Sequence, residues 1–160
     1  MIPNKNPTEL ETIRHSCAHL MAQAVQELFP GTQVTIGPVI EDGFYYDFQL
    51  EKPFTPDDLD DIRKYIKEVI SLGLPFSPSD ITREEASSMF SDQPFKLEII
   101  NDIPRDESIS IYSHGHFSDL CRGPHLEHTG QIIAFELLSV AGAYWRGDEK
   151  RPMLQRIYGT

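Results

Sequence analysis

The first thirty residues place their apolar side chains at the spacing of an α-helix. Asn6 as the capping residue, Pro7 at the first helical position and Glu9 in the first turn indicate where the helix begins. Pro30-Gly31 ends the pattern. The apolar residues between these signals recur every three or four positions: Leu10, Ile13, Cys17, Leu20, Met21, Ala24 and Leu28. We therefore expect a long N-terminal helix.

The next hundred residues alternate between strand and helix signals. Residues 34–40 and 44–48 flank Glu41-Asp42-Gly43, which is typical of a hairpin. A second helix opens at Thr55-Pro56 and stops at Gly73. Its inward residues are Leu59, Ile62, Ile66, Val69 and Ile70. The capping box Thr82-Arg83-Glu84-Glu85 predicts a short third helix.

Beyond Pro94 the apolar period changes to two, which predicts strands. Phe95, Leu97 and Ile99 alternate with polar residues, so Lys96 is expected on the opposite face of a strand. Further strands are expected at residues 108–112, 131–140 and 153–158. Helices interrupt the strands irregularly and no βαβ repeat emerges. The predicted class is therefore α+β, with a mostly antiparallel sheet and a smaller helical and strand lobe.

Composition limits what such a fold can do. The chain has 160 residues, 39% of them hydrophobic and 24% charged, which suits one globular domain. No apolar run reaches the roughly 20 residues that cross a bilayer, and the first residues lack a secretion signal, so we expect a cytoplasmic protein without membrane contact. The 25 acidic residues exceed the 14 basic ones and give a formal net charge of −11. Any contact with nucleic acid should therefore be local and involve a short single-stranded end.

Two motifs carry candidate chemistry. His15 and His19 lie four residues apart, on one face of the first helix and roughly opposite its apolar stripe. They belong either to a solvated face or to a cleft. Cys121 and His125 flank Arg122-Gly123-Pro124, a turn that can bring both side chains to one point. The alternative is a structural turn with one buried thiol. Together the four side chains match the ligand types of a tetrahedral zinc site.

Other polar residues are candidates with competing explanations. Asp119 lies two residues before Cys121, where it either orients a histidine and accepts a proton or caps a turn. Lys96 offers a cation to an oxyanion or a phosphate. Trp145 and Arg146 suit the stacking of a terminal base, but a surface hairpin tip explains them equally well.

Neighbouring aromatic and histidine side chains complete the set of candidates. Tyr45 and Tyr46 are adjacent in a strand, so one packs inward and the other faces any cleft. His114 and His116 flank Gly115 in a turn. Either one of them reaches the site or both are solvated, and we expect them to be solvated.

Several longer runs closely resemble the editing region of bacterial-type threonyl-tRNA synthetases. The likeness extends from about Ile13 to the last residue. Paired His-x-x-x-His and Cys-x-x-x-His motifs are shared with alanyl-tRNA editing domains, whereas the Cys-Arg-Gly-Pro-His and Ala-Gly-Ala-Tyr-Trp-Arg-Gly-Asp runs resemble the threonyl enzymes. The runs that carry the resemblance are residues 15–19, 37–40, 43–47, 119–125, 141–148 and 153–160.

The resemblance implies a first helix that lies along a cleft against an antiparallel sheet. It also implies an activity: proofreading hydrolysis of seryl-tRNA for threonine, which removes serine from the 3′-terminal adenosine. By resemblance, the water is positioned and activated by His15, Lys96 and Asp119. The seryl group and the terminal nucleotide are expected to contact His19, Tyr46, Cys121, His125, Arg122 and Trp145.

The resemblance implies partners and bears on the metal. The expected partners are the 3′ end of tRNA(Thr) and the aminoacylation and anticodon domains of the same synthetase. No cofactor is expected for editing. Zinc fits the ligand types but is not favoured, and its ligands would be His15, His19, Cys121 and His125. Residues 1–160 then form one editing domain with its motifs at about 13–160, and the strand-like end suggests a cut or a domain boundary. The alternatives are a structural zinc module and a tRNA-end binding module without catalysis.

Overall fold

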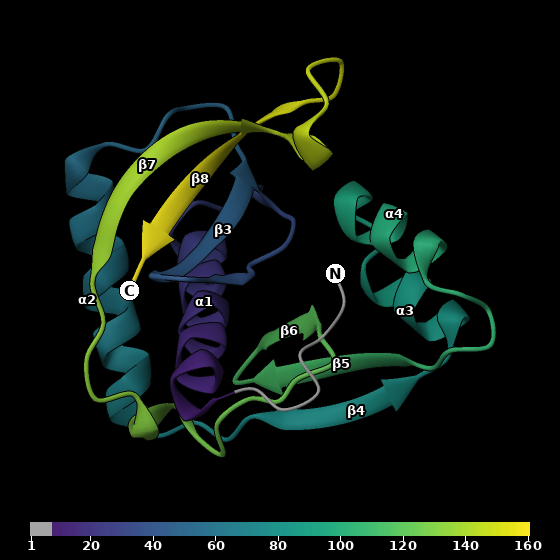
Figure 1. Cartoon of the computed structure of the whole chain (residues 1–160), viewed down its shortest axis with the longest axis horizontal. Helices are drawn as coiled ribbons and strands as arrows, with labels where there is room; N and C mark the ends of the chain where they lie inside the picture. The colour runs from purple at the N-terminus through teal and green to yellow at the C-terminus, as the bar shows by residue number, and fades with distance from the viewer. Residues whose placement is uncertain (1–7) are drawn as a thin grey trace.

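The computed structural model of the protein describes residues 8–160, and a long helix, α1 (Glu9–Leu28), lies near its centre (Figure 1). Thr8 caps this helix: its side chain accepts from the Glu11 backbone N–H, and the Glu11 carboxylate accepts from the Thr8 N–H. The N-cap is therefore not Asn6, because a reciprocal capping box is available two residues later. Asn6 and Pro7 themselves lie outside the described residues.

The larger sheet is antiparallel and packs against α1. Its strand order is β1-β3-β8-β7, and β2 also pairs with β3. The predicted hairpin is confirmed, because Val39 pairs with Phe44 across the turn. Phe44, Tyr46 and Phe48 point from β3 into the main core. The strands are β1 (Gln33–Val34), β2 (Val39–Ile40), β3 (Gly43–Gln49), β7 (Leu137–Tyr144) and β8 (Met153–Gly159).

The second helix, α2 (Pro56–Leu72), closes the same core beside α1 (Figure 1). Thr55 caps its start and Gly73, in the left-handed conformation, ends it, as the sequence predicts. Ile62, Ile66 and Val69 are its buried side chains. Burial of this apolar stripe, rather than intrinsic helix propensity, supplies most of the stabilisation of such a helix.

A smaller lobe is formed by the second sheet and two short helices. The sheet order is β4-β5-β6, and α3 and α4 lie at one end of it (Figure 1). Ala86, Phe90 and Ile100 from the helices pack on Ile109 and Ile111 of β5. The elements are β4 (Ser77–Ile81), α3 (Arg83–Met89), α4 (Pro94–Asp102), β5 (Ile109–His114) and β6 (Phe117–Leu120).

Three predicted strands are wrong in part or in whole. The strand expected at 34–40 forms only at its ends, as β1 and β2. The segment after Pro94 is the helix α4, because a proline at the first helical position starts a helix and a five-residue alternation fits either period. Lys96 is therefore buried in a helix, as Phe95 and Ile100 are, and does not lie opposite an apolar strand face. The expected strand at 131–140 begins only at Leu137, after the 3₁₀ turn η1 (Thr129–Gln131).

A small third cluster joins the two parts of the fold. Trp145 lies in the 3₁₀ turn η2 (Trp145–Gly147) between β7 and β8, and it packs with Phe95 of α4 and Leu154 of β8. The α+β class, the long first helix and the antiparallel sheets are confirmed. Within residues 8–160, no helix is both long enough and apolar enough to cross a membrane.

Candidate active site

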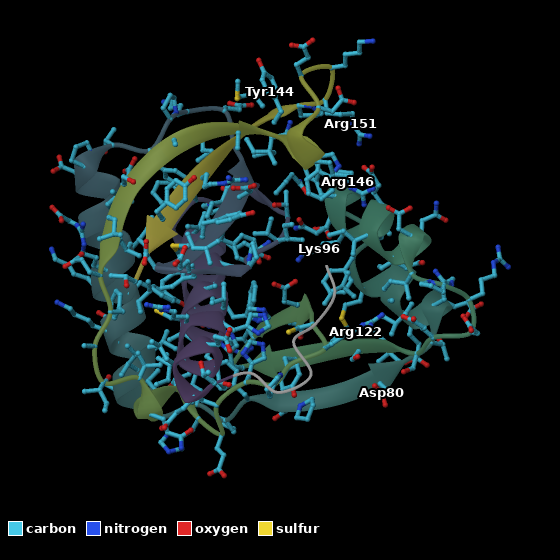
Figure 2. The ribbon with its side chains drawn as sticks, viewed as in Figure 1. Asp80, Lys96, Arg122, Tyr144, Arg146 and Arg151 are labelled. Atoms are coloured by element: carbon cyan, nitrogen blue, oxygen red, sulfur yellow. The ribbon has the colours of Figure 1, made fainter. Side chains whose placement is uncertain are left out.

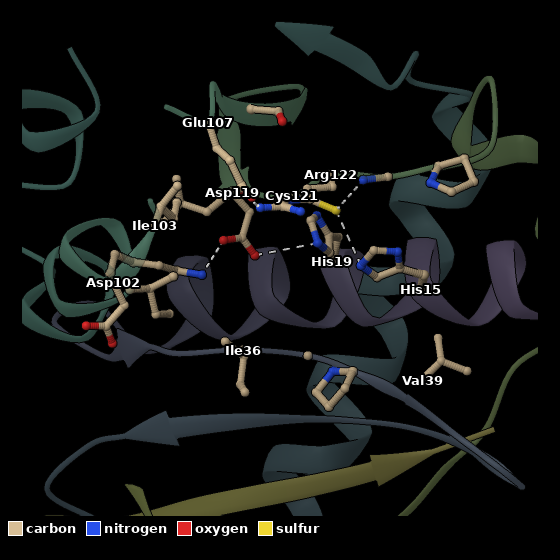
Figure 3. Close-up of a pocket in the computed structure, with 18 of the residues that line it drawn as sticks. His15, His19, Ile36, Val39, Asp102, Ile103, Glu107, Asp119, Cys121 and Arg122 are labelled. Carbon is tan, nitrogen blue, oxygen red and sulfur yellow. Dashed lines mark hydrogen bonds and ion pairs between the residues drawn. The ribbon is translucent and has the colours of Figure 1, made fainter. Parts of the chain in front are cut away.

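A cavity of about 860 Å³ opens between α1 and the smaller lobe. Figure 3 shows His15 and His19 rising from α1 toward Cys121 and Asp119, with Ile36 and Val39 on the opposite side of the pocket. The helix thus lies along a cleft, as expected. The remaining walls come from residues 37–39, from α4 with residues 103–108, from residues 119–124, and from Trp145 and Arg146.

A buried network lies at the inner wall of the cavity. The Lys96 ammonium is ion-paired with the Asp119 carboxylate and donates to the Thr35 carbonyl at 2.6 Å and to the Tyr46 hydroxyl at 3.0 Å. The Tyr46 hydroxyl in turn donates to Asp119 Oδ2 at 2.7 Å. A lysine ammonium has three hydrogens, so all of its donors are occupied within this network. Figure 2 shows Lys96 reaching inward, between Arg146 above and Arg122 below.

This network is almost inaccessible to solvent. Lys96 and Asp119 are each 2% exposed, and Tyr46 is fully buried. Burial and the adjacent Asp119 charge raise the pKa of the Tyr46 phenol well above its usual value, so the phenol stays protonated and remains a donor to the carboxylate. His19 approaches from α1, with its Nε2 3.6 Å from Asp119 Oδ2. Asp119 therefore connects the ammonium to the histidine cluster.

The two sequence motifs meet at this point, although about a hundred residues separate them. Cys121 Sγ lies 3.4 Å from His15 Nε2 and 3.2 Å from His125 Nε2. The rings of His15 and His125 stack with their centroids 4.4 Å apart, and the His19 and His125 centroids are 4.3 Å apart. The cleft alternative for the histidine pair is therefore the correct one.

Burial keeps these groups uncharged near neutral pH. Desolvation lowers the pKa of His15, even though the Asp119 charge acts in the opposite direction. Desolvation likewise moves the pKa of His19 and of His125 well below the ordinary value. Burial raises the pKa of the Cys121 thiol to about 12. Neutral imidazoles retain one unprotonated nitrogen, so the cluster offers proton acceptors at pH 7.

Local backbone geometry fixes the turn that carries Cys121 and His125. Gly123 has a φ of +76°, and a Cβ at this position would lie 2.3 Å from the Tyr112 hydroxyl oxygen, so only glycine fits. The Ser16 hydroxyl on α1 accepts from the Leu126 N–H at 3.1 Å and lies 3.0 Å from His125 Nδ1. The turn is thereby held against the helix beside the histidine pair.

The same four side chains satisfy the main requirements of a zinc site. One ligand atom from each of His15, His19, Cys121 and His125 lies within 4.8 Å of all the others. A tetrahedral zinc ion keeps its ligand atoms about 3.3–3.8 Å apart, so a small contraction would suffice. The Ser16 hydroxyl already contacts the second nitrogen of His125, as outer groups do around metal-bound histidines. These residues would hold zinc, and zinc would supply a Lewis acid.

Two predicted tRNA-end contacts lie away from this cluster. Arg122 is half exposed at the cavity wall and forms an ion pair with Glu107. Trp145 lines the cavity but is only 2% exposed, and its Nε1–H donates to Glu98 at 3.0 Å. Its ring is contacted edge-on by Phe95 and covered by the Arg146 guanidinium, 5.1 Å from the ring. Contact of either residue with tRNA remains a prediction.

The expectation that His114 is solvated is wrong. Its side chain is 1% exposed and lies between Phe76 and Phe117, with ring centroids 5.0 and 5.2 Å away. The reason is that β5 continues two residues beyond the expected end, and a tight turn with Gly115 at a positive φ of 59° follows. The sequence signal for this tight turn is Gly115, which lies in a two-residue loop directly before the aromatic strand residue Phe117.

Comparison with known proteins finds a matching family model and similar sequences. A model described as the threonyl and alanyl tRNA synthetase second additional domain matches residues 109–158. The relatives below extend this likeness over the whole chain. The chain is therefore similar to that family over residues 109–158 and to threonine–tRNA ligases over nearly all of its length. The match to the family model includes Asp119, Cys121 and His125, whereas the histidine pair of α1 and Lys96 precede it.

The relatives that match the chain include several threonine–tRNA ligases. A threonine–tRNA ligase of Nitrosomonas eutropha is 57% identical over 100% of the chain and 26% of its own length. The corresponding ligases of Rhizobium etli and Dehalococcoides mccartyi are 55% and 53% identical, over 100% and 98% of the chain and 24% and 27% of their own lengths. The chain thus spans about a quarter of the length of the curated relatives it matches.

Proposed function

We propose that this domain proofreads the product of a threonine–tRNA ligase by hydrolysing the ester that joins serine to the 3′-terminal adenosine of tRNA(Thr). One observation carries the proposal: the neutral His15 and the buried Lys96–Asp119 pair face the same cavity. The match to the family model and the likeness to threonine–tRNA ligases support the substrate class.

Ester hydrolysis assigns a task to each of these groups. A water oxygen attacks the ester carbonyl carbon, and the water proton passes to a base, for which we propose the unprotonated nitrogen of His15. The carbonyl oxygen becomes negative in the transition state, and the charge of Lys96 stabilises it from the inner wall. The bond to the 3′ oxygen then breaks, and that oxygen takes up a proton. Asp119 holds Lys96 and His19 in place.

The need for proofreading follows from the size of the difference between the two amino acids. Serine lacks one methyl of threonine, and a pocket that senses one methyl discriminates by only about 1–3 kcal/mol. A second pocket that admits the smaller product and excludes the larger corrects the error. We propose that His19, Tyr46, Cys121 and His125 shape this pocket. His19 and Cys121 line the cavity, Tyr46 donates to Asp119, and His125 contacts Cys121.

The charge of the chain indicates how the tRNA would be bound. A net charge of −11 repels a polyanion at long range, so this domain should contact only the 3′ end. We propose that Arg122 and Arg146, both at the cavity wall and each about half exposed, make those contacts. The remaining affinity would come from the aminoacylation and anticodon domains of the same synthetase.

A second candidate function is zinc binding by the histidine and cysteine cluster, without catalysis. The mutual spacing of the four ligand atoms, within 4.8 Å, favours it. The two candidates differ in what they require. The deacylase needs an accessible proton acceptor at His15, whereas the zinc module needs that nitrogen as a ligand and the Cys121 thiol deprotonated.

The test measures loss of the amino acid from purified seryl- and threonyl-tRNA(Thr). We expect the wild-type chain to hydrolyse the seryl ester selectively. His15→Ala should slow it by about 10²–10⁴-fold, the usual worth of a general base, with unchanged thermal unfolding. His128→Ala is the matched control, because His128 is exposed and lies outside the cavity lining. Equal rates for His15→Ala and wild type would refute the assignment.

A further inference from the structure

Buried polar atoms without partners gather behind the histidine cluster. Among the described residues, five buried side-chain atoms lack a hydrogen bond within the protein. Four of them belong to His19 (Nδ1), Gln23 (Oε1) and His114 (Nδ1 and Nε2). Leaving such an atom unpaired is costly, so a group of four in one place requires an explanation.

These three side chains converge from two elements. His19 and Gln23 lie four residues apart on α1, one turn beyond His15 on the same face. His114 ends β5, and its ring centroid is 6.5 Å from that of His19. The Gln23 amide lies against the same turn, because a Cβ on Gly115 would be 3.4 Å from Gln23 Nε2. All three side chains are at most 6% exposed.

The spacing of the rings suits one bridging water. Ring nitrogens lie only about 1 Å from their centroids, so centroids 6.5 Å apart are too distant for a direct hydrogen bond between the rings. A buried water typically makes about three hydrogen bonds to otherwise unsatisfied groups. The aromatic rings of Phe76 and Phe117 stand beside His114 and separate it from solvent.

We propose that His19, Gln23 and His114 form a hydration site that holds one ordered water and fixes the tautomer of His19. The ionised Asp119 beside Nε2 favours a proton on that nitrogen, which leaves Nδ1 as an acceptor. The water donates one hydrogen to His19 Nδ1 and the other to Gln23 Oε1, and it accepts from a ring N–H of His114. Three of the four unpaired atoms are thereby satisfied.

His114 is on this account a positioning residue for the site. It does not line the cavity. His114 influences His19 through the bridging water. The His19 side chain lines the cavity and contacts Asp119 and His125. The kinetic consequence rests on the proposed function, whereas the tautomer of His19 and the presence of the water do not.

The experiment uses the zinc-free chain and the variant His114→Phe. Phenylalanine keeps the ring packing against two phenylalanines but removes both nitrogens. His114→Gln retains a donor and an acceptor, and His116→Phe is the matched control, because His116 is exposed in the same turn. Side-chain ¹⁵N chemical shifts report the tautomer of His19, and a high-resolution crystal structure reports the water.

We expect a single His19 tautomer, protonated at Nε2, in wild type, His116→Phe and His114→Gln, and a mixture in His114→Phe. We also expect kcat for deacylation to fall about tenfold in His114→Phe, the equivalent of one lost hydrogen bond, with KM unchanged. An unchanged tautomer in His114→Phe, or a wild-type crystal without water between these side chains, would overturn the inference. A wild-type chain without deacylase activity would refute the proposed function alone, because both structural readouts would still apply.

Discussion

Replacing Lys96 by methionine should destabilise the fold far more than the loss of a surface charge does. The ammonium is 2% exposed and holds the Asp119 carboxylate, the Thr35 carbonyl and the Tyr46 hydroxyl. Methionine fills a similar volume but leaves the carboxylate buried without its cation. Removing one partner of a buried ion pair costs about 3–5 kcal/mol.

That loss converts into a measurable change in melting temperature. For domains of 150–250 residues, one kcal/mol shifts Tm by about 2–4 °C, so Lys96→Met should melt about 6–20 °C below wild type. Trp145 is the only tryptophan and is buried, so its fluorescence reports unfolding in urea as well as on heating. Glu136→Gln is the control. It breaks the ion pair between Arg63 and the Glu136 carboxylate, and the Glu136 side chain is 57% exposed. This variant should therefore change the free energy of unfolding much less.

A double-mutant cycle identifies the cause of the loss. Lys96→Met and Asp119→Asn each leave one buried charge without its partner, whereas the double variant removes both charges together. We therefore expect the double variant to lose at least about 2 kcal/mol less than the sum of the single losses. Additive losses, or a Lys96→Met stability within about 1 kcal/mol of wild type, would show that the pair is not the buried interaction described above.

Two further predictions concern metal and pH. Active protein should hold no stoichiometric zinc and should keep its deacylase activity in a chelator, because a zinc ion would occupy the His15 nitrogen that the proposed reaction needs as a proton acceptor; one equivalent of zinc, with activity lost on chelation, would contradict this. The pKa of His114 is lowered from 6.5 to about 4, so between these values the unfolded chain binds a proton that the folded chain does not. The free energy of unfolding should therefore fall by up to about 3 kcal/mol as the pH falls through this window. Urea titrations at a series of pH values should show that it depends less steeply on pH in His114→Phe than in wild type.

The sequence predicts the helices that begin with capping signals. Thr55 and Thr82 cap α2 and α3 as expected, because a cap is encoded in the few residues around it. The strand β4 escapes prediction for the opposite reason. Its Ser77-Pro78-Ser79-Asp80 run has no strand-forming residues and is exposed, and it is held at the sheet edge by pairing with β5. Its conformation depends on a partner strand about thirty residues away.

In the candidate site, too, the local relations are predictable from the sequence and the long-range contacts are not. The spacing of His15 and His19 predicts a shared face, and the Gly123-Pro124 turn predicts the approach of Cys121 to His125, because both relations are local. The neighbours of Lys96 were not predictable from spacing. A wrong period placed it on a strand, and its partners Thr35, Tyr46 and Asp119 come from three other segments that only tertiary packing brings together.

The Lys96 network explains why the cleft and the fold depend on each other. Lys96 belongs to α4 and Asp119 to β6, both in the smaller lobe, whereas Tyr46 belongs to β3 of the larger sheet. One set of buried hydrogen bonds therefore joins the two sheets at the inner wall of the cavity. Variants of these residues should alter packing and chemistry together. His15 lies at the cavity wall without a role in either sheet, so it is the residue at which loss of chemistry can be separated from loss of structure.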